Sequence, residues 1–144
     1  MPVWAGQIIT VGQINRIQPV TYSAVGSGTV TGPQTNADVP SATVTLTTLT
    51  AGATYKAWCT WDVNVTAGAT GTWLGRMALD GTGQSPLATM SHPTSTGRGT
   101  PTQTYHGTLA AAGSHTFKLI ASPMTSQVVQ GVNCSIVVEI TEVV

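Results

Sequence analysis

The sequence predicts an all-β protein built as a sandwich or a barrel, and three observations lead there. The β-branched residues dominate, with 26 threonines among 144 residues, while strong helix formers are few. Roughly seven to nine short stretches alternate apolar and polar residues, as strands with one buried face do. Turn signals separate these stretches about every 8–12 residues, a spacing typical of sandwiches and barrels. A chain of this length can bury its core as one domain.

Residues 1–19 differ from the rest and predict an N-terminal arm with a short helix. In TVGQINRIQP, Gln13 follows Thr10 at the spacing of a capping box, and Pro19 ends the helix. A helix of this length is unstable alone. Its apolar face must therefore dock, either on its own domain or on a neighbouring subunit. The apolar residues of the arm are Trp4, Ile8, Ile9, Val11, Ile14 and Ile17.

Residues 20–144 are predicted to form the β-domain. The longest alternating stretch is YKAWCTWDVNV (55–65), and the region 82–103 reads as a long loop with a short edge strand near Leu87–Met90. The remaining predicted segments are VTYSAVGSGTVTG (20–32, a strand or an interrupted hairpin), TNADVPS (35–41, a turn), ATVTLTTL (42–49), TWLGRMALDG (72–81), TYHGTLAAAGSHTFKLIAS (104–122, two strands) and NCSIVVEITEVV (133–144).

One phrase occurs twice. LTAGATYKAWC (49–59) has a looser echo in LAAAGSHTFKLIA (109–121), and each places Leu, small residues and Gly before an aromatic residue. We predict the same turn at both points. The Leu packs inward at a strand end, the Gly permits a backbone conformation that strains other residues, and Tyr55 or Phe117 anchors the return strand.

Charge is scarce and balanced. Only 7 % of the residues are charged and the formal net charge is zero, against roughly 25 % charged residues in an average domain. Five basic residues scattered along the chain argue against nucleic acid as a partner. The start, MPVWAGQ, lacks the features of a secretory signal, and no apolar run is long enough for a membrane span. Weak charge repulsion favours a permanent assembly over a free protein.

The two cysteines, Cys59 and Cys134, are too few for a disulfide scaffold. Each lies among apolar residues at strand spacing, which favours two buried small hydrophobes. If the two strands are neighbours, a disulfide between these cysteines is the alternative.

Four phrases in a fixed order suggest a family. They are LTAGATY (49–55), GTW (71–73), GTLAAAGSHTFKL (107–119) and CSIVVEI (134–140), and the opening WAGQIITVGQIN (4–15) adds a fifth. Together they resemble the small jelly-roll domains of tailed-phage virion proteins, which are related in shape to the tumour-necrosis-factor and complement-C1q heads. The resemblance implies a jelly-roll β-sandwich and a homotrimer with one sheet of each sandwich packed about the threefold axis. It implies no catalytic residues.

The residues that carry chemistry are few. No H-x-H pair exists, and no acid lies near His106 or His115 in the sequence, which argues against a metal site. Asp38 and Asp80 stand in turn contexts, where carboxylates accept hydrogen bonds from backbone amides. No nucleophile elbow and no phosphate-binding loop is present. We expect no cofactor, no metal and no enzymatic activity.

Trp58 is the aromatic residue that points to function. Strand alternation places it opposite Cys59 and Trp61. It therefore lies on the polar face, with Lys56, Thr60, Asp62 and Asn64. An outward Trp either stacks on a sugar or is covered by a partner, and a sandwich trimer favours the partner. Trp61 and Trp73 are predicted to lie in the core.

These expectations combine in a non-enzymatic phage virion protein, most specifically a homotrimeric capsid decoration protein on the outer surface of the shell. Its partners would be its own copies and the major capsid protein. The alternatives are a tail-fibre or receptor-binding tip that binds host-surface glycan through residues 82–103, and a free carbohydrate-binding module. The predicted interface residues are Trp4, Ile8, Ile9, Ile14, Ile17 and Trp58.

Overall fold

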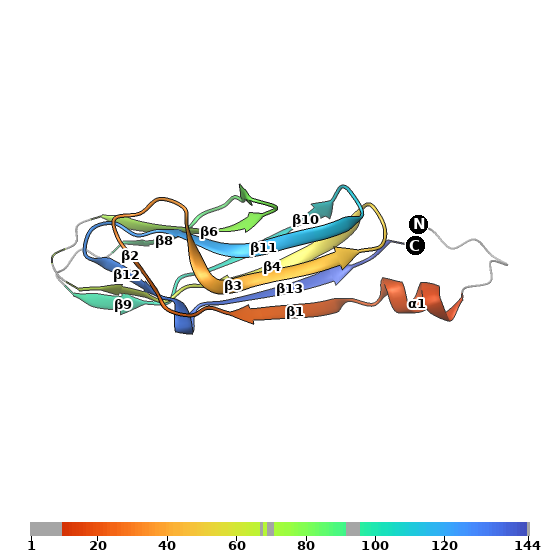
Figure 1. The fold of residues 1–144 in the computed structure, drawn as a ribbon, viewed down its shortest axis with the longest axis horizontal. Helices are drawn as coiled ribbons and strands as arrows, with labels where there is room; N and C mark the ends of the chain where they lie inside the picture. Colours follow the sequence, from red (N-terminus) through yellow and green to blue (C-terminus); the bar gives the residue numbers. More distant parts are fainter. Residues whose placement is uncertain (1–9, 67, 69–70, 92–95, 144) are drawn as a thin grey trace.

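The computed structural model describes residues 10–66, 68, 71–91 and 96–143. This part of the chain is an elongated antiparallel β-sandwich with one short helix, α1 (Val11–Ile17), beyond one end (Figure 1). The all-β sandwich predicted from the sequence is confirmed. The helix begins one residue after Thr10 and ends two residues before Pro19, as the capping pattern and the proline predict.

The first sheet joins strands from both ends of the chain. Its order is β1-β13-β4-β10, and every neighbouring pair is antiparallel. The C-terminal strand β13 therefore lies in the middle, between the first strand of the domain and β4. The bounds are β1 (Val20–Val25), β13 (Ser135–Thr141), β4 (Ala53–Thr60) and β10 (Thr102–Leu109).

The second sheet packs across the core from the first. Its order is β3-β11-β6, and two short strands, β7 and β8, both pair with β6 and together form its last edge. The bounds are β3 (Ala37–Thr48), β11 (Gly113–Ser122), β6 (Thr72–Leu79), β7 (Thr82–Gly83) and β8 (Ala88–Ser91). The edge strand predicted near Leu87–Met90 is β8.

The strand order is that of a jelly roll. When β7 and β8 are taken as one broken strand, the first sheet reads first-eighth-third-sixth along the chain and the second reads second-seventh-fourth-fifth. Two Greek keys wound into facing sheets give this order. Since the last strand lies beside the first, both ends of the domain are held in one sheet.

A third group of strands prolongs the first sheet. Its order, β2-β12-β5-β9, follows that of the first sheet because each strand directly precedes or follows its counterpart along the chain. The sequence predicted one strand over 55–65. The structure breaks it at Trp61 and Asp62, where backbone hydrogen bonds run instead to Pro101 and Gln130. The bounds are β2 (Thr29–Thr31), β12 (Gln127–Gln130), β5 (Val63–Val65), β9 (Gly97–Gly99) and the 3-10 helix η1 (Gly131–Asn133).

The turn predicted over residues 35–41 is wrong for most of its length, because β3 begins at Ala37. Thr35 and Asn36 form a bend before the strand, and Asn36 has a φ of 50°, which Asn tolerates better than most residues. Ser41, inside β3, also has a positive φ, of 62°. Pro40 fits inside β3 because this strand pairs only with β11 and is an edge. Asp38 is therefore a strand residue and not a turn cap.

Aromatic pairs fill the core between the sheets. Trp61 and Trp73 are fully buried, as predicted, and their rings meet edge to face at 5.7 Å between centroids. Tyr55 and Phe117, the aromatic residues of the repeated phrase, form a second edge-to-face pair at 5.2 Å. The two copies of the phrase thus meet inside the molecule.

The turns of the two copies differ in their leucines. Gly52 and Gly113 adopt φ of 85° and 128°, which confirms why glycine is needed there. Leu109 is buried, but Leu49 is 69 % exposed, so its predicted inward packing is wrong. The reason is strand parity: Thr48 takes the inward position at the end of β3, and the next residue faces outward.

Candidate functional site: an assembly surface

The arm helix leaves its apolar side chains uncovered. α1 continues the line of β1 beyond the end of the sandwich (Figure 1). Val11, Ile14 and Ile17 are 74 %, 43 % and 50 % exposed. These residues do not pack on their own sandwich, which was one of the two docking options predicted for the arm. The predicted interface residues Trp4, Ile8 and Ile9 lie outside the described residues.

Trp58 lies at the centre of the outer face of the first sheet. It is 43 % exposed, as the strand alternation predicted, although a tryptophan is among the residues that gain most from burial. In register, its neighbours are Val137 on β13 and Thr104 on β10, and Val137 in turn lies opposite Ser23 on β1. We call this surface the Trp58 face; it comprises Thr21, Ser23, Val25, Thr54, Lys56, Trp58, Thr60, Thr102, Thr104, His106, Thr108, Ser135, Val137, Glu139 and Thr141.

The charges of the Trp58 face cancel. Lys56 and Glu139 stand opposite each other on β4 and β13, with Nζ and Oε1 3.9 Å apart. His106 continues this row on β10. The rest of the face is hydroxyls with the apolar side chains of Val25, Trp58 and Val137. Because the face has no net charge, it needs no oppositely charged partner surface, but its hydroxyls need new hydrogen-bond partners when another protein covers them.

β1 forms one edge of the same sheet, since it pairs only with β13. Its ends carry Val20 and Val25, 47 % and 63 % exposed. Natural proteins usually protect such an edge with charges, proline or a covering segment. Here the edge runs directly into the exposed stripe of α1. The exposed apolar residues of β1 and α1 therefore follow one another along one side of the described part of the molecule.

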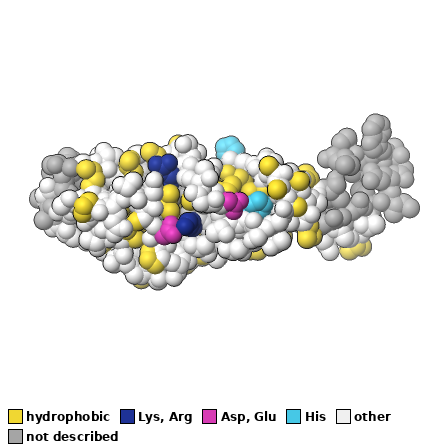
Figure 2. All heavy atoms as spheres, turned by 45° about the horizontal axis from the view of Figure 1, so that its top comes forward, with side chains coloured by type: hydrophobic (Ala, Val, Ile, Leu, Met, Phe, Trp, Pro, Cys, Tyr) yellow, Lys and Arg dark blue, Asp and Glu magenta, His cyan; other side chains and the backbone are white. Residues whose placement is uncertain are grey.

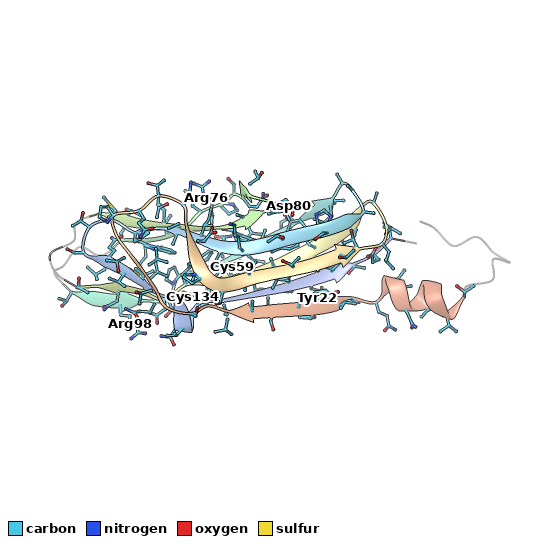
Figure 3. All side chains as sticks on the ribbon, in the orientation of Figure 1. Tyr22, Cys59, Arg76, Asp80, Arg98 and Cys134 are labelled. Atoms are coloured by element: carbon cyan, nitrogen blue, oxygen red, sulfur yellow. The ribbon has the colours of Figure 1, made fainter. Side chains whose placement is uncertain are left out.

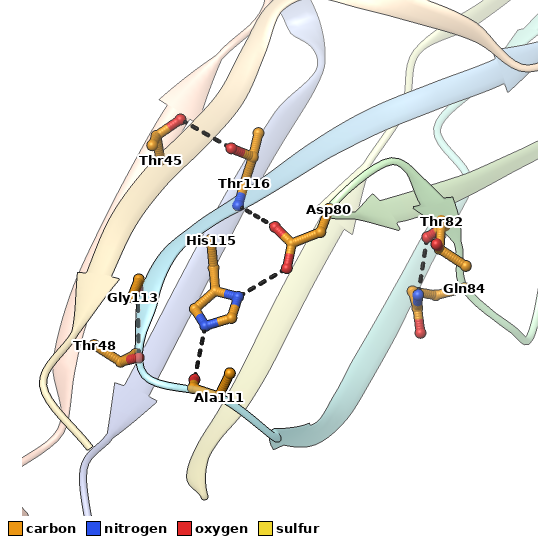
Figure 4. Close-up of polar contacts among 9 residues, drawn as sticks. All are labelled: Thr45, Thr48, Asp80, Thr82, Gln84, Ala111, Gly113, His115 and Thr116. Carbon is orange, nitrogen blue, oxygen red and sulfur yellow. Dashed lines mark hydrogen bonds and ion pairs between the residues drawn. The ribbon is translucent and has the colours of Figure 1, made fainter. Parts of the chain in front are cut away.

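The expectation that no acid lies near His115 is wrong. Asp80, at the turn after β6, places Oδ2 2.8 Å from His115 Nδ1, and its Oδ1 accepts the Thr116 backbone N–H at 2.8 Å (Figure 4). His115 Nε2 lies 3.1 Å from the carbonyl oxygen of Ala111. The Asp80 hydrogen bond raises the pKa of His115, and burial opposes this rise. The cluster ties a turn to β11, and Asp80 does accept a backbone amide as predicted.

Asp62 stabilises the point where the first sheet breaks. Its predicted place on the outer face beside Trp58 is wrong, because β4 ends at Thr60 and Asp62 is buried. Its side chain is only 6 % exposed and accepts hydrogen bonds from Arg98 Nε at 2.7 Å, from Arg98 Nη2, and from Asn133 Nδ2 at 2.7 Å. The Arg98 hydrogen bonds hold the pKa of Asp62 below its ordinary value, against the effect of burial. Sequence reasoning missed this cluster because its members are 36 and 71 residues apart.

Both cysteines are free and buried, so the prediction of two small buried hydrophobes is confirmed (Figure 3). Burial raises the pKa of the Cys59 thiol to about 12. The Cys134 sulfur accepts the Asp62 backbone N–H at 3.4 Å. It therefore supports the same break in the sheet.

The described residues contain no group of three or more His, Cys, Asp or Glu side chains arranged to hold a metal ion. No helix among them has the length and hydropathy needed to cross a membrane. The chain matches no protein-family model. A comparison with curated proteins likewise gives no match. The functional argument therefore depends on the surfaces described above.

Proposed function

We propose that the protein is a non-enzymatic structural component of a tailed-phage virion, and specifically a homotrimeric decoration protein on the outer surface of the capsid. The observation that carries the proposal is the arm: α1 presents Val11, Ile14 and Ile17 away from the sandwich, all at least 43 % exposed. A short amphipathic helix is not stable without a partner for its apolar side. A neighbouring subunit or a shell protein supplies that partner.

The trimer is proposed to form through the Trp58 face. Three copies about a threefold axis would bring Trp58, Val137 and Val25 of each sandwich against the next copy, with the Lys56–Glu139 pair compensating itself. Burial of apolar area drives such association at about 25 cal/mol per Å² removed from water. The jelly-roll strand order and the phrases that resemble phage jelly rolls support this arrangement.

Attachment to a shell would use many weak contacts at once. Each arm adds a small apolar contact, and a trimer with three arms gains affinity by multivalency. A chain with only 7 % charged residues depends on apolar and hydroxyl contacts rather than on ion pairs. This mechanism needs no ligand and no chemical step.

The test is a quantitative mass-spectrometric inventory of purified particles of the phage that encodes the chain. Hundreds of copies per particle are expected for a decoration protein, whereas a few tens or fewer would favour the tail-tip alternative. Absence from the particle contradicts both.

A pair of variants tests the arm. Ile14→Asp combined with Ile17→Asp is expected to abolish binding to capsids stripped of the protein, while the solution mass remains that of a trimer. Val132→Asp is the matched control because this residue is apolar and 58 % exposed but belongs to η1 and not to the arm. If both variants bind like the wild type, the arm is not the attachment element.

A further inference from the structure

An open groove with both polar and apolar walls lies on the outer side of the second sheet, on the opposite face of the sandwich from Trp58. Its walls are the loop between β2 and β3, the outer face of β6, and the segment that follows β11. Its volume is about 650 Å³, within the range of small-molecule sites. The polar residues that line it are Gln34, Thr35, Asn36, Thr72, Arg76, Ser122 and Thr125, and the apolar ones are Pro33, Leu74, Pro123 and Met124.

Hydrogen bonds fix the two loop walls against each other. The Gln34 backbone N–H donates to the Pro123 carbonyl oxygen, and the Asn36 backbone N–H donates to Ser122 Oγ, both at 2.9 Å. Gly32 permits this approach, because a Cβ at that position would overlap the backbone of Met124. The groove is therefore preformed, since hydrogen bonds within the protein fix its walls.

Arg76 lies in this groove and pairs with no carboxylate of the described residues. By contrast, Lys56, Arg98 and Lys118 each pair with a carboxylate. Arg76 has no such pair and no hydrogen bond to any described residue. It is half-buried on the outer side of β6 (Figure 3).

No carboxylate of the chain is left over for Arg76. Asp38, Asp62, Asp80 and Glu139 are engaged with Lys118, Arg98, His115 and Lys56. Glu142 accepts the backbone N–H groups of Leu49 and Thr50 at 2.7 and 3.0 Å. Charged side chains are few on the face that Figure 2 shows, and no carboxylate side chain of the described residues neutralises this guanidinium.

The aliphatic part of the Arg76 side chain is also held in place by its packing. It passes over Gly83 on β7, where a Cβ would lie 2.7 Å from Arg76 Cδ. The planar guanidinium matches a carboxylate with two parallel hydrogen bonds. Around it, the Asn36 amide and the hydroxyls of Thr35 and Thr125 have no partner among the described residues, so they are free to bond a polyhydroxylated ligand.

We propose that this groove binds a carboxylate-bearing carbohydrate. Arg76 holds the carboxylate, and the amides and hydroxyls of the walls bond the sugar hydroxyls. Carbohydrate is favoured over an acidic peptide because the three free polar side chains, those of Thr35, Asn36 and Thr125, suit a ligand rich in hydroxyls, and the apolar part of the lining suits the C–H face of a sugar ring. The inference does not depend on the proposed virion role, since the groove lies away from the Trp58 face and from α1.

The experiment applies the full chain to an array of sialic-acid-, uronic-acid- and sulfate-bearing glycans beside their neutral counterparts. The best acidic glycan is then titrated by calorimetry together with its methyl ester. We expect acidic glycans to bind above neutral ones, and the methyl ester to bind about tenfold or more weakly because it cannot accept a bidentate Arg pair.

Arg76→Met keeps most of the stem and removes the charge, and it is expected to lower the affinity about tenfold or more. Arg76→Lys keeps the charge without the fork and is expected to fall between the two. Arg16→Met is the matched control, with the same substitution on α1, away from the groove, and should leave the affinity within about twofold of the wild type. Thermal melts of each variant confirm that it folds.

Three outcomes would overturn the proposal. The first is that no carboxylate-bearing glycan binds above its neutral counterpart. The second is that Arg76→Met and Arg16→Met weaken binding equally, which would indicate unspecific charge attraction. The third is that a hexaglutamate peptide binds as tightly as the best glycan and loses its affinity in Arg76→Met, which would assign the groove to acidic peptides.

Discussion

Replacement of Asp62 by alanine tests whether the buried carboxylate holds the break in the first sheet. The variant removes the acceptor of three hydrogen bonds, two from Arg98 and one from Asn133. The Arg98 side chain is 56 % exposed, so water replaces most of what it loses and solvent screens its share. Asn133 is exposed as well, so the loss is that of the hydrogen bonds which the buried Asp62 carboxylate accepts. A hydrogen bond to a buried charge contributes about 1.5–3 kcal/mol, so we expect a loss of about 2 kcal/mol.

The assay is urea unfolding followed by tryptophan fluorescence at one fixed protein concentration, because oligomerisation makes apparent stability concentration-dependent. In a thermal melt, a loss of this size lowers Tm by roughly 4–8 °C in a domain of this length. Asp38→Ala is the matched control. Asp38 also contacts a lysine at 2.7 Å, but its side chain is 59 % exposed, and such pairs contribute about 0.2–1 kcal/mol.

The pH dependence has a fixed sign. Because the Arg98 hydrogen bonds lower the pKa of Asp62 in the folded state, its stabilisation is fully present above the ordinary pKa of 3.8 and is lost as the pH falls through the folded value. The stability difference between the wild type and Asp62→Ala should therefore shrink below that pH. Equal losses for Asp62→Ala and Asp38→Ala at neutral pH would refute the reasoning.

Two further predictions concern titratable groups. His115 bridges Asp80 and a backbone carbonyl, and its pKa is raised in the folded state. Its contribution to stability is thus present below pH 6.5 and lost as the pH rises through the folded value. An NMR titration should give His115 a pKa above 6.5, and His115→Gln should remove this pH-dependent loss of stability. A pKa at or below 6.5 would contradict the cluster. Burial raises the pKa of Cys59 to about 12 and also raises that of Cys134, so both thiols should resist iodoacetamide at neutral pH until the chain unfolds, and fast labelling of the native protein argues against their packing.

The fold followed from the sequence because strand alternation and turn chemistry are local. β4 and β13 show the alternation that the residues predict, with Cys59 inward and Trp58 outward. The helix bounds followed from Thr10 and Pro19 for the same reason. Where local rules compete with sheet pairing they failed: pairing with β11 extends β3 back to Ala37, through a segment whose composition favours a turn.

The site was only partly predictable. The exposure of Trp58, Ile14 and Ile17 follows from parity and helical spacing, which are local. The Asp62 cluster and the Arg76 groove depend on side chains brought together from distant strands. The role of Arg76 could not be predicted from the sequence. It depends on each carboxylate side chain having another partner, and spacing in the sequence does not show which side chains pair across the sandwich.

The central claim is that the Trp58 face is an interface between copies of this chain. Sedimentation equilibrium of the full chain, at micromolar concentrations and neutral pH, tests it most directly. The account predicts a species of three 14.8 kDa chains, about 44 kDa, and its conversion to a folded monomer in Trp58→Arg. A wild-type protein that stays a monomer of 14.8 kDa at the highest concentrations reached would contradict it.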